Sequence, residues 1–407
     1  MSTPDTVARA SRGRAVTHGA FARITDLERE FDRYLTQPSV APAAAQPLQL
    51  AAARWSTAVW EAAQICGPAD LDTDHVSRGL EIAHRPLLVC GAHRSGTTLV
   101  RDLLDGHSSL AVLPSEGSFF TSSERHLRQL PAESWVAYMG CEWLRRLANP
   151  IHQQPYWLLG RSSREISAYV EFARALMAWW PFARDKAHVK SSWPLVAVAL
   201  AYAHCTGRFS APSVCDRWAE KTPTNERFLE PLLAEFPQAK VIHEVRHPFA
   251  VYASHKEYAR TTGQRFRNAA QVLRDIDLSY RIAAERYREG AQDYLLIRYE
   301  ELIECMPATV ARLAAFAGIE PEGALMQPTA AGLPTMNNSS FAMDDPLGSV
   351  HPTVHRKWAD TLTRYDCERV AAAVGASAAC LGYELDPIAP WRARLIRLGT
   401  RITSKLP

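Results

Sequence analysis

Residues 86–116 read PLLVCGAHRSGTTLVRDLLDGHSSLAVLPSE, and this stretch decides how the chain is expected to fold. The apolar run at 87–90 predicts a short strand that is buried on both faces of a parallel sheet. A glycine-containing segment follows at 91–98, and the spacing of the apolar residues at 99–104 predicts a helix. Such a strand, loop and helix start direct backbone N–H groups and the positive end of the helix dipole toward one point. The sequence therefore predicts an anion site at this loop.

The side chains of the loop add charge and hydrogen-bond donors. Arg94 carries a guanidinium, and Ser95, Thr97 and Thr98 carry hydroxyls. The spacing of the two glycines matches the triphosphate loop G-x-x-x-x-G-K-[ST], but Thr97 stands where that pattern has its lysine. A triphosphate-splitting enzyme relies on that lysine and on Mg²⁺. A cation inside the loop, at Arg94, instead favours a donor whose leaving phosphate needs no metal bridge.

A second anchor lies at residues 240–255, which read KVIHEVRHPFAVYASH. The apolar residues between 241 and 245 predict another buried strand, and Arg246 stands at its end. Ser254 falls two turns into the helix that follows, so the two side chains could hold one phosphate together. Taken alone, Arg246 would be as well explained by an ion pair at the end of a strand. Its pairing with the first loop favours the phosphate site.

Composition and charge narrow the class of protein. The chain has 407 residues, of which 47% are hydrophobic and 22% charged, and its formal net charge is +3. Because no basic block with interleaved aromatic residues occurs, we expect no nucleic-acid partner. The eight cysteines form no C-x-x-C pair, which predicts reduced thiols and a cytoplasmic location. No apolar stretch resembles a secretory signal or spans a bilayer, so we expect a soluble protein.

The regions around the two anchors are expected to be helical. Residues 21–65 predict helices with a break at 37–47, and their apolar face is expected to pack on the main domain through Trp55, Val59, Trp60 and Ala63. The segment 117–218 predicts a helical insertion that holds seven of the eleven tryptophans. Most of these are expected in the core, and a few are expected to line an acceptor pocket.

The two anchors together resemble the PAPS-dependent sulfotransferases, where PAPS is 3′-phosphoadenosine 5′-phosphosulfate. In that family the first segment is the 5′-phosphosulfate loop and the second is the 3′-phosphate site. Three further segments resemble the family in the right order, and they read WAEKTPTN at 218–225, LIRYEEL at 296–302 and HRKW at 355–358. The resemblance runs from about residue 86 to 383. It implies PAPS as the co-substrate and no metal.

Within the family the chain is more similar to the tyrosylprotein, membrane-type and bacterial enzymes than to the cytosolic phenol enzymes. The cytosolic pattern has a tryptophan at the position of Leu99 and a catalytic histidine at that of Pro223. The tyrosylprotein group uses a glutamate beyond the loop helix, and Glu116 stands within one residue of that position. The resemblance also implies that Ser339 or Ser340 corresponds to a serine that contacts the sulfate in that group.

The resemblance assigns roles to particular residues. It implies Glu116 as the base, with Lys221 and Arg94 stabilising the charge that builds up during transfer. The residues that it implies for holding the co-substrate are His93, Arg94, Ser95, Gly96, Thr97, Thr98, Arg246, Ser254, Arg356 and Lys357. The alternative interpretations are that Glu116 is a surface carboxylate and that Lys221 is a solvated surface lysine. A nucleotide kinase and a catalytically silent nucleotide-binding protein are the alternative functions, and the acceptor stays open among sugar, peptide tyrosine, lipid, antibiotic and phenol.

The expected fold is α/β, with a P-loop-like parallel sheet flanked by helices. We expect an N-terminal helical extension at 1–85, the α/β domain at 86–390 with the insertion 117–218 on its acceptor side, and a tail at 391–407. The tail predicts a helix with an apolar stripe and basic flanks, and the stripe consists of Trp391, Leu395, Leu398, Ile402 and Leu406. The stripe suits an anionic membrane surface, but docking on this protein's own core or on a partner subunit of a homodimer is the more common fate of such helices.

Overall fold

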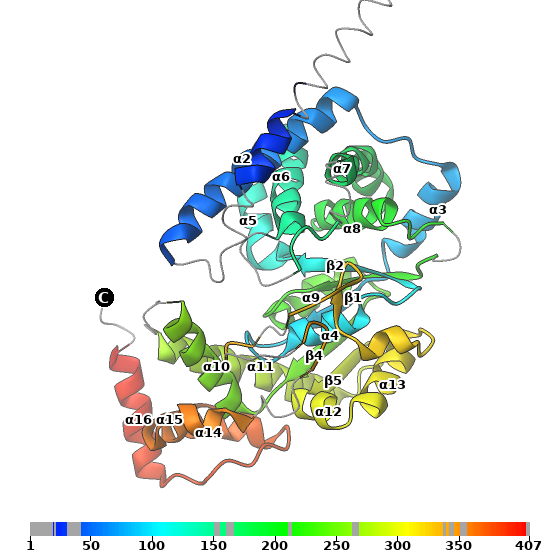
Figure 1. Ribbon diagram of the computed structural model, residues 1–407. Helices are drawn as coiled ribbons and strands as arrows, with labels where there is room; N and C mark the ends of the chain where they lie inside the picture. Colours follow the sequence, from blue (N-terminus) through cyan, green and yellow to red (C-terminus); the bar gives the residue numbers. More distant parts are fainter. Residues whose placement is uncertain are drawn as a thin grey trace, which may run out of the picture. The chain divides into compact units, whose positions relative to one another are not determined.

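The computed structural model of the chain describes residue 19 and residues 22–30, 42–149, 155–159, 167–210, 214–262, 268–336, 339–341, 346–350 and 356–403. The backbone forms many helices around a central sheet (Figure 1). Contacts within the chain divide it into two compact units. Unit 1 consists of residues 1–85 and 108–218, and unit 2 consists of residues 86–107 and 219–407.

The central sheet has five strands in the order β2-β3-β1-β4-β5. The strands are β1 (Leu87–Cys90), β2 (Leu110–Glu116), β3 (Arg217–Lys221), β4 (Lys240–Val245) and β5 (Tyr294–Arg298). Strand β1 pairs in parallel with β3 and β4, and β4 pairs in parallel with β5. All four residues of β1 are buried, as expected for an uninterrupted apolar run in a parallel sheet.

The larger helices of unit 1 pack on one another. They are α2 (Pro42–Cys66), α3 (Thr73–Ile82), α6 (Trp135–Ala148), α7 (Ser167–Lys186) and α8 (Trp193–Cys205). Trp60 of α2 lies so close to Gly140 of α6 that a Cβ on the glycine would collide with the indole ring. The Trp55 ring meets the edges of Trp157 and Tyr169, with centroids 5.3 and 5.1 Å away. The apolar face of α2 thus packs on the helical insertion, which belongs to the expected main domain 86–390.

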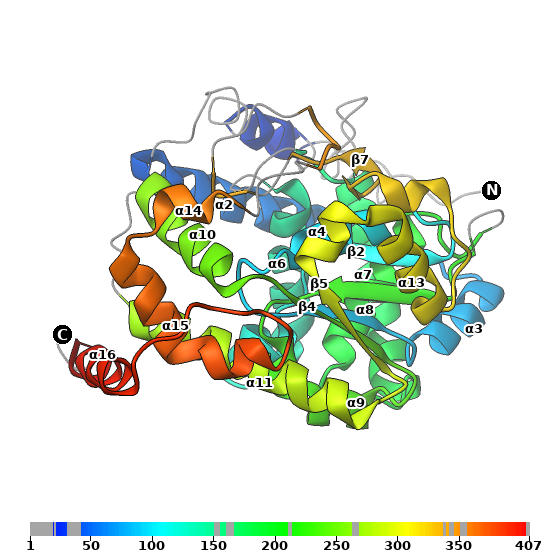
Figure 2. The same ribbon diagram turned by 90° about the horizontal axis from the view of Figure 1, so that it is seen from below.

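Helices cover both faces of the strands in unit 2. They are α4 (Thr97–Leu104), α9 (Leu229–Glu235), α10 (Pro248–Thr261), α11 (Ala269–Glu289), α12 (Tyr299–Glu304), α13 (Met306–Ala317), α14 (Trp358–Thr361), α15 (Arg364–Ala379) and α16 (Pro390–Thr403). Figure 2 shows α13 on one side of β4 and β5 and α11 on the other. This arrangement leaves the ends of the strands as the place where loops meet.

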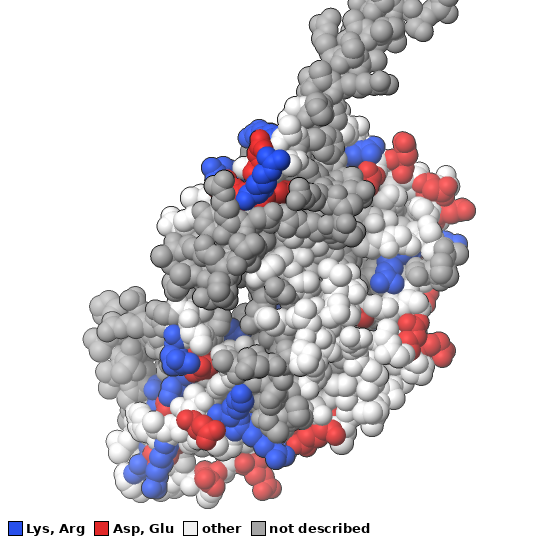
Figure 3. Space-filling view, viewed as in Figure 1, with Lys and Arg blue, Asp and Glu red and all other residues white. Residues whose placement is uncertain are grey.

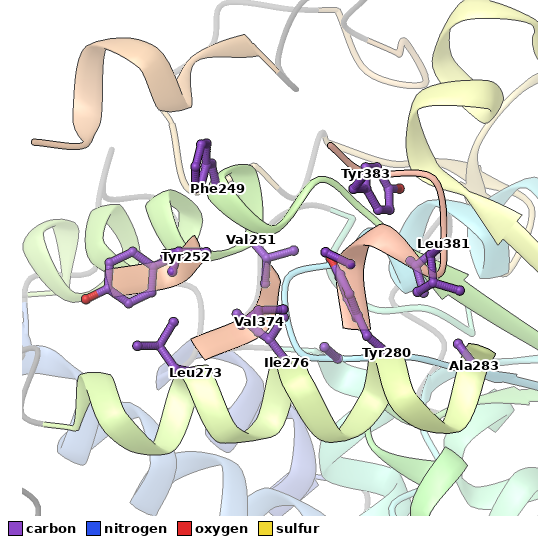
Figure 4. Close-up of a cluster of buried hydrophobic side chains, with 14 of the residues drawn as sticks. Phe249, Val251, Tyr252, Leu273, Ile276, Tyr280, Ala283, Val374, Leu381 and Tyr383 are labelled. Carbon is purple, nitrogen blue, oxygen red and sulfur yellow. The ribbon is translucent and has the colours of Figure 1, made fainter. Parts of the chain in front are cut away.

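A hydrophobic core joins α10, α11 and α15 beside the sheet (Figure 4). Helix α11 contributes Leu273, Ile276 and Tyr280, which recur every three to four residues and so share one face. Val251 of α10 and Val374 of α15 point into the same cluster. Because α10 begins directly after β4, this core fixes the direction in which that helix leaves the second anchor.

The structure confirms the predicted fold class, a parallel α/β sheet with flanking helices, a mostly helical insertion and N-terminal helices. The predicted break at 37–47 is wrong over its second half, because α2 already begins at Pro42 and continues through Pro47. Alanines favour helix strongly enough to tolerate one missing backbone donor there. Within the described residues, no helix combines the length and apolarity needed to cross a membrane. The predicted domain boundaries stay predictions.

Candidate active site

The two anchors and Lys221 lie at one edge of the sheet. Parallel pairing sets Val89 of β1 opposite Lys221, the last residue of β3, and Cys90 opposite His243 of β4. The loop after β1 and the segment after β4 therefore leave the sheet side by side at its carboxyl edge. Ligands of open α/β sheets bind at that edge.

The loop after β1 has a conformation that requires glycine. Gly96 is the residue before α4 and has a φ of 117°, which side-chain-bearing residues rarely adopt. A Cβ at this position would collide with the ring of Tyr299 and lie 2.8 Å from Glu244 Oε1. Arg94 also has a positive φ, of 71°. The backbone thus turns sharply twice before α4 begins, which exposes N–H groups at the start of the helix.

Buried polar groups hold this loop from below. The Ser95 hydroxyl donates to the Ala92 carbonyl at 2.7 Å, so this side chain closes the turn of the loop itself. The Gly91 N–H donates to Glu226 Oε2 at 3.1 Å, and the Thr224 N–H donates to the Gly91 carbonyl at 2.9 Å. The segment after β3 therefore supports the loop that follows β1. This arrangement leaves Thr97 and Thr98, at the first two positions of α4, as the hydroxyls nearest the helix start.

Helix α10 holds the loop from the other side. The guanidinium of Arg94 lies 4.1 Å above the ring of Tyr258, a cation–π distance. His255 Nε2 lies 3.2 Å from the His93 carbonyl. Burial lowers the pKa of His255 to about 4, and the charge of Arg94 acts in the same direction. The imidazole is therefore neutral at pH 7, and its N–H donates to that carbonyl. The side chain of His93 is exposed, and the contact with His255 is made by its backbone carbonyl.

Arg246 has unused donors in a buried position. Its side chain is almost fully buried, and its guanidinium lies 4.3 Å above the ring of Tyr299. One nitrogen, Nη1, donates to the Arg94 carbonyl at 3.4 Å. Nε and Nη2 have no hydrogen-bond partner among the described residues. Leaving buried charged donors unpaired is costly, so this geometry suits an anion that accepts from both.

Ser254 is the residue that the sequence predicts as the partner of Arg246 in phosphate binding, and this role stays a prediction. It is buried on α10, and its hydroxyl lies 3.1 Å from the hydroxyl of Ser340. Of the two candidate serines, Ser340 is thus the one beside the second anchor, while the Ser339 hydroxyl accepts from the Phe341 N–H. The segment that carries Ser340 follows a short hairpin, which Asp105 holds through the Thr329 hydroxyl and the Gly332 N–H, both at 2.7 Å. Two serines from distant parts of the chain therefore meet at this point.

Lys221 is buried at the end of β3, which excludes the alternative interpretation of a solvated surface lysine. The carboxyl of Asp102 in α4 lies close enough for the charge of Lys221 to act on it. Burial raises the pKa of Asp102 to about 6, while the charges of Arg101 and Lys221 lower it. Lys221 therefore lies near the helix that follows the first loop.

The basic segment near the C-terminus returns to the second anchor. Trp358 stacks on His247, the residue after Arg246, with parallel rings 5.5 Å apart. Arg356 is exposed, and its guanidinium lies 3.3 Å from Glu304 of α12. Lys357 lies between them and is half-buried. His355 lies outside the described residues, but Trp358 of the same segment contacts His247 just after β4, and the return of this segment to the nucleotide stays a prediction.

Glu116 ends strand β2 in unit 1, and the other predicted site residues lie in unit 2. Its backbone is fixed by Arg146 of α6, whose Nη1 donates to the Glu116 carbonyl and, at 3.4 Å, to the Gly117 carbonyl. Glu142 in turn accepts from Arg146 Nε at 3.0 Å. The role of Glu116 as the base stays a prediction.

Sequence reasoning missed two residues beside the first loop, Tyr258 and Glu244. Tyr258 follows Ser254 by four residues, so helical periodicity offered a signal for it. Glu244 offered none, because it occupies a strand position that the apolar pattern predicts as core. It is fully buried beside Gly96, and neither of its oxygens has a hydrogen-bond partner among the described residues. Burial raises its pKa well above the ordinary value, against the opposing charge of Arg246.

The tryptophans of the insertion are mostly core residues, as expected. Trp143, Trp157, Trp179, Trp180 and Trp218 are buried. Trp135 and Trp193 are half-buried and stack on each other with centroids 6.0 Å apart. These two are the partly exposed tryptophans of the set.

Comparison with known proteins adds the family. A model described as the sulfotransferase family matches residues 86–322, more than half of the chain. Among solved structures, the sulfotransferase domain from the curacin biosynthetic pathway is 18% identical, with a TM-score of 0.41, over 74% of this chain and 99% of its own. The sulfotransferase domain of the Synechococcus PCC 7002 olefin synthase is 20% identical, with a TM-score of 0.40, over 74% and 96%. Sulfotransferase STF9 from Mycobacterium avium is 13% identical, with a TM-score of 0.38, over 77% and 86%.

No curated protein matches the chain significantly. The family match begins at Pro86, directly before β1, and includes both anchors, Lys221 and Glu116. The chain belongs to the sulfotransferase family.

Proposed function

We propose that the protein transfers a sulfuryl group from PAPS to a hydroxyl or an amine of an acceptor and releases adenosine 3′,5′-bisphosphate. The observation that carries this proposal is that two guanidinium nitrogens of the buried Arg246, Nε and Nη2, have no hydrogen-bond partner among the described residues. A phosphate supplies the acceptor oxygens and the negative charge that these donors lack. A nucleotide kinase would hold its triphosphate through the loop lysine, which this chain lacks, and its chemistry would not explain the buried arginine at position 246.

The roles in binding follow from the two anchors. The 3′-phosphate accepts from Arg246 Nε and Nη2 and from Ser254, with Ser340 beside it. The 5′-phosphosulfate lies at the start of α4, where backbone N–H groups and the hydroxyls of Thr97 and Thr98 can donate to it. Ser95 and Gly96 shape the loop, and Arg356 and Lys357 add positive charge near the nucleotide.

The roles in chemistry concern the charge that moves during an in-line transfer. The bond between sulfur and the oxygen of the 5′-phosphate breaks as a bond from sulfur to the acceptor oxygen or nitrogen forms. Glu116 takes the acceptor's proton. Lys221 and Arg94 stabilise the negative charge on the sulfuryl oxygens and on the leaving phosphate. Arg94 lies above the ring of Tyr258 in this structure. It either acts on the phosphosulfate from that position or gives up this contact when the ligand binds.

The first test is binding of adenosine 3′,5′-bisphosphate in excess chelator. Because protein groups supply all the positive charge in this proposal, a hundredfold excess of ligand over Kd should stabilise the fold by about 2.7 kcal/mol. ATP with Mg²⁺ is the comparison that represents a kinase. Stabilisation by ATP with Mg²⁺ and not by the bisphosphate would contradict the proposal.

The second test is transfer itself. Incubation with radiolabelled PAPS and extracts of candidate acceptors should label a product, and Glu116→Gln should lower its rate by roughly 10²- to 10⁴-fold without weakening binding of the bisphosphate. A Gln variant with the turnover of the native protein would assign the base elsewhere, while binding of the bisphosphate would still support the nucleotide site.

A further inference from the structure

The C-terminal helix α16 is held to unit 2 by one of its faces. Ala393 and Ile396, three residues apart, are buried. Arg392 binds Glu368 of α15 through Nε at 3.2 Å and Nη2 at 2.8 Å. Helix α16 packs on α15 and α11 along this side. The first turns of the tail thus have a defined orientation on the protein.

The face that this orientation leaves outside is apolar. Trp391 is 65% exposed and Leu395 is 60% exposed, and their separation of four residues makes them neighbours on the helix surface. Every other tryptophan of the chain is buried or half-buried. At Trp391 and Leu395, the expectation that the stripe docks on this protein's own core is therefore wrong. The side chains of Leu398, Ile402 and Leu406 lie outside the described residues.

The same face is surrounded by positive charge. Arg394 is exposed between Trp391 and Leu395 in the sequence, and Arg392 remains about half exposed despite its ion pair. From residue 387 to the end the chain has five basic residues and no acidic one. In Figure 3, blue side chains, with red ones among them, are visible over the part of the surface where α16 lies in Figure 1. A partner for this face must therefore be anionic and must also accept a tryptophan and a leucine.

We infer that the exposed face of α16 binds an anionic lipid surface, with Trp391 and Leu395 at the level of the headgroups and the arginines against lipid phosphates. Tryptophan favours the boundary between water and hydrocarbon, because its ring is apolar and its N–H is polar. Arginine favours anionic headgroups, and a helix with one apolar face lies in the plane of that boundary. This inference stands independently of the proposed function.

The experiment is sedimentation of the full chain with vesicles of phosphatidylcholine, alone or mixed with phosphatidylglycerol. Binding is expected to the mixed vesicles only, and to weaken in high salt because the arginines act by charge. The double variant Trp391→Ala/Leu395→Ala should lower binding by roughly tenfold or more, because its apolar contact is gone. Tyr287→Ala is the matched control, since this aromatic residue of α11 is 66% exposed and lies outside the tail.

A second pair of variants separates charge from apolar contact. Arg394→Gln should weaken binding to the mixed vesicles, whereas Arg281→Gln, an exposed arginine of α11, should not. Equal binding by the native chain and the double variant would overturn the inference, and so would a native chain that stays in the supernatant with both lipids. Self-association that the double variant loses, without lipid binding, would assign the face to a second copy and would likewise overturn it.

Discussion

Arg246 illustrates how a single buried side chain indicates a ligand. Its guanidinium is held by the ring of Tyr299 and by the Arg94 carbonyl, yet two of its nitrogens have no partner among the described residues. Folding would not bury a charged fork with unused donors unless the remaining contacts or a ligand compensated for it. An anion beside Ser254 supplies that compensation.

Arg246→Ala should weaken binding of adenosine 3′,5′-bisphosphate by about 1.5–3 kcal/mol, because a charge-assisted hydrogen bond is lost. The affinity of Arg246→Lys should lie between those of the native chain and of Arg246→Ala, since lysine keeps the charge and loses the planar fork. Arg312→Ala, which removes an exposed ion pair with Glu301, is the control. Isothermal titration calorimetry measures all three, and an unchanged affinity of Arg246→Ala would refute the 3′-phosphate assignment.

Arg146 is a positioning residue for the proposed base. It donates to the backbone carbonyl of Glu116 and is itself oriented by Glu142. Arg146→Lys keeps the charge but cannot reach both groups with one nitrogen, so kcat should fall by roughly ten- to a hundredfold through misplacement of the carboxylate. Affinity for adenosine 3′,5′-bisphosphate should not change.

The control for Arg146 is Arg145→Lys, since Arg145 pairs with the same Glu142 from the neighbouring position. A double variant makes the test specific. If Arg146 acts through Glu116, Arg146→Lys should add little to the loss already caused by Glu116→Gln. Additive losses in kcat would mean that Arg146 supports the fold and not the base.

At the scale of elements, the turn between β1 and α4 depends on glycine for two reasons, its positive φ and the absence of a Cβ. Gly96→Ala should therefore destabilise the protein and abolish nucleotide binding, because Tyr299 and Glu244 leave no space. Gly290→Ala is a matched control, with a φ of 64° and no atom within 4 Å of the added Cβ. That variant should cost only about 1 kcal/mol. Similar losses of thermal stability in both would show that the contacts at Gly96 do not matter.

At the scale of the whole molecule, buried histidines make stability depend on pH. Burial lowers the pKa of His243 to about 3, and of His255 to about 4, below their ordinary value of 6.5. Between these values and 6.5 the unfolded chain binds more protons, so the free energy of unfolding should fall as the pH drops from about 6.5 toward 4. Each group contributes up to about 1.4 kcal/mol per pH unit within its window.

His255→Gln tests this dependence, because it removes one of the two groups. Its stability relative to the native chain should rise as the pH falls from about 6.5 to 4, as measured by chemical denaturation at several pH values. His126→Gln, at an exposed histidine of α5 (Glu124–Leu127), is the control. A difference in stability between His255→Gln and the native chain that does not vary with pH would contradict the assignment.

Glu244 should act with the opposite sign and at higher pH. Its pKa in the folded protein is raised, so its contribution is present at low pH and is lost as the pH rises through that value. Glu244→Gln preserves the shape of the neutral acid and cannot ionise. Relative to the native chain, the thermal stability of the variant should rise as the pH increases from about 4.5, the ordinary pKa of a glutamate, until the raised pKa is passed. A variant that loses stability throughout would indicate an ionised Glu244.

The sequence by itself determined the elements whose causes are local. The run at 87–90 specified a buried strand, the glycines of the loop specified its turn, and the order of strands and helices specified a parallel α/β sheet. The spacing between Arg246 and Ser254 likewise predicts two side chains near one point; both are buried, and their shared role stays a prediction. Patterns of this kind are readable because hydrophobic period and turn chemistry act over a few residues.

Only the tertiary structure decided which distant groups meet these elements. The contact of Arg146 with the Glu116 backbone, the stacking of Arg94 on Tyr258 and the contact of Ser340 with Ser254 join segments that no local pattern connects. The tail shows the reason clearly. Its apolar stripe was readable from the sequence, but α15 packs against Ala393 and Ile396 and leaves Trp391 and Leu395 outside, because the face that a helix buries depends on the surface it meets.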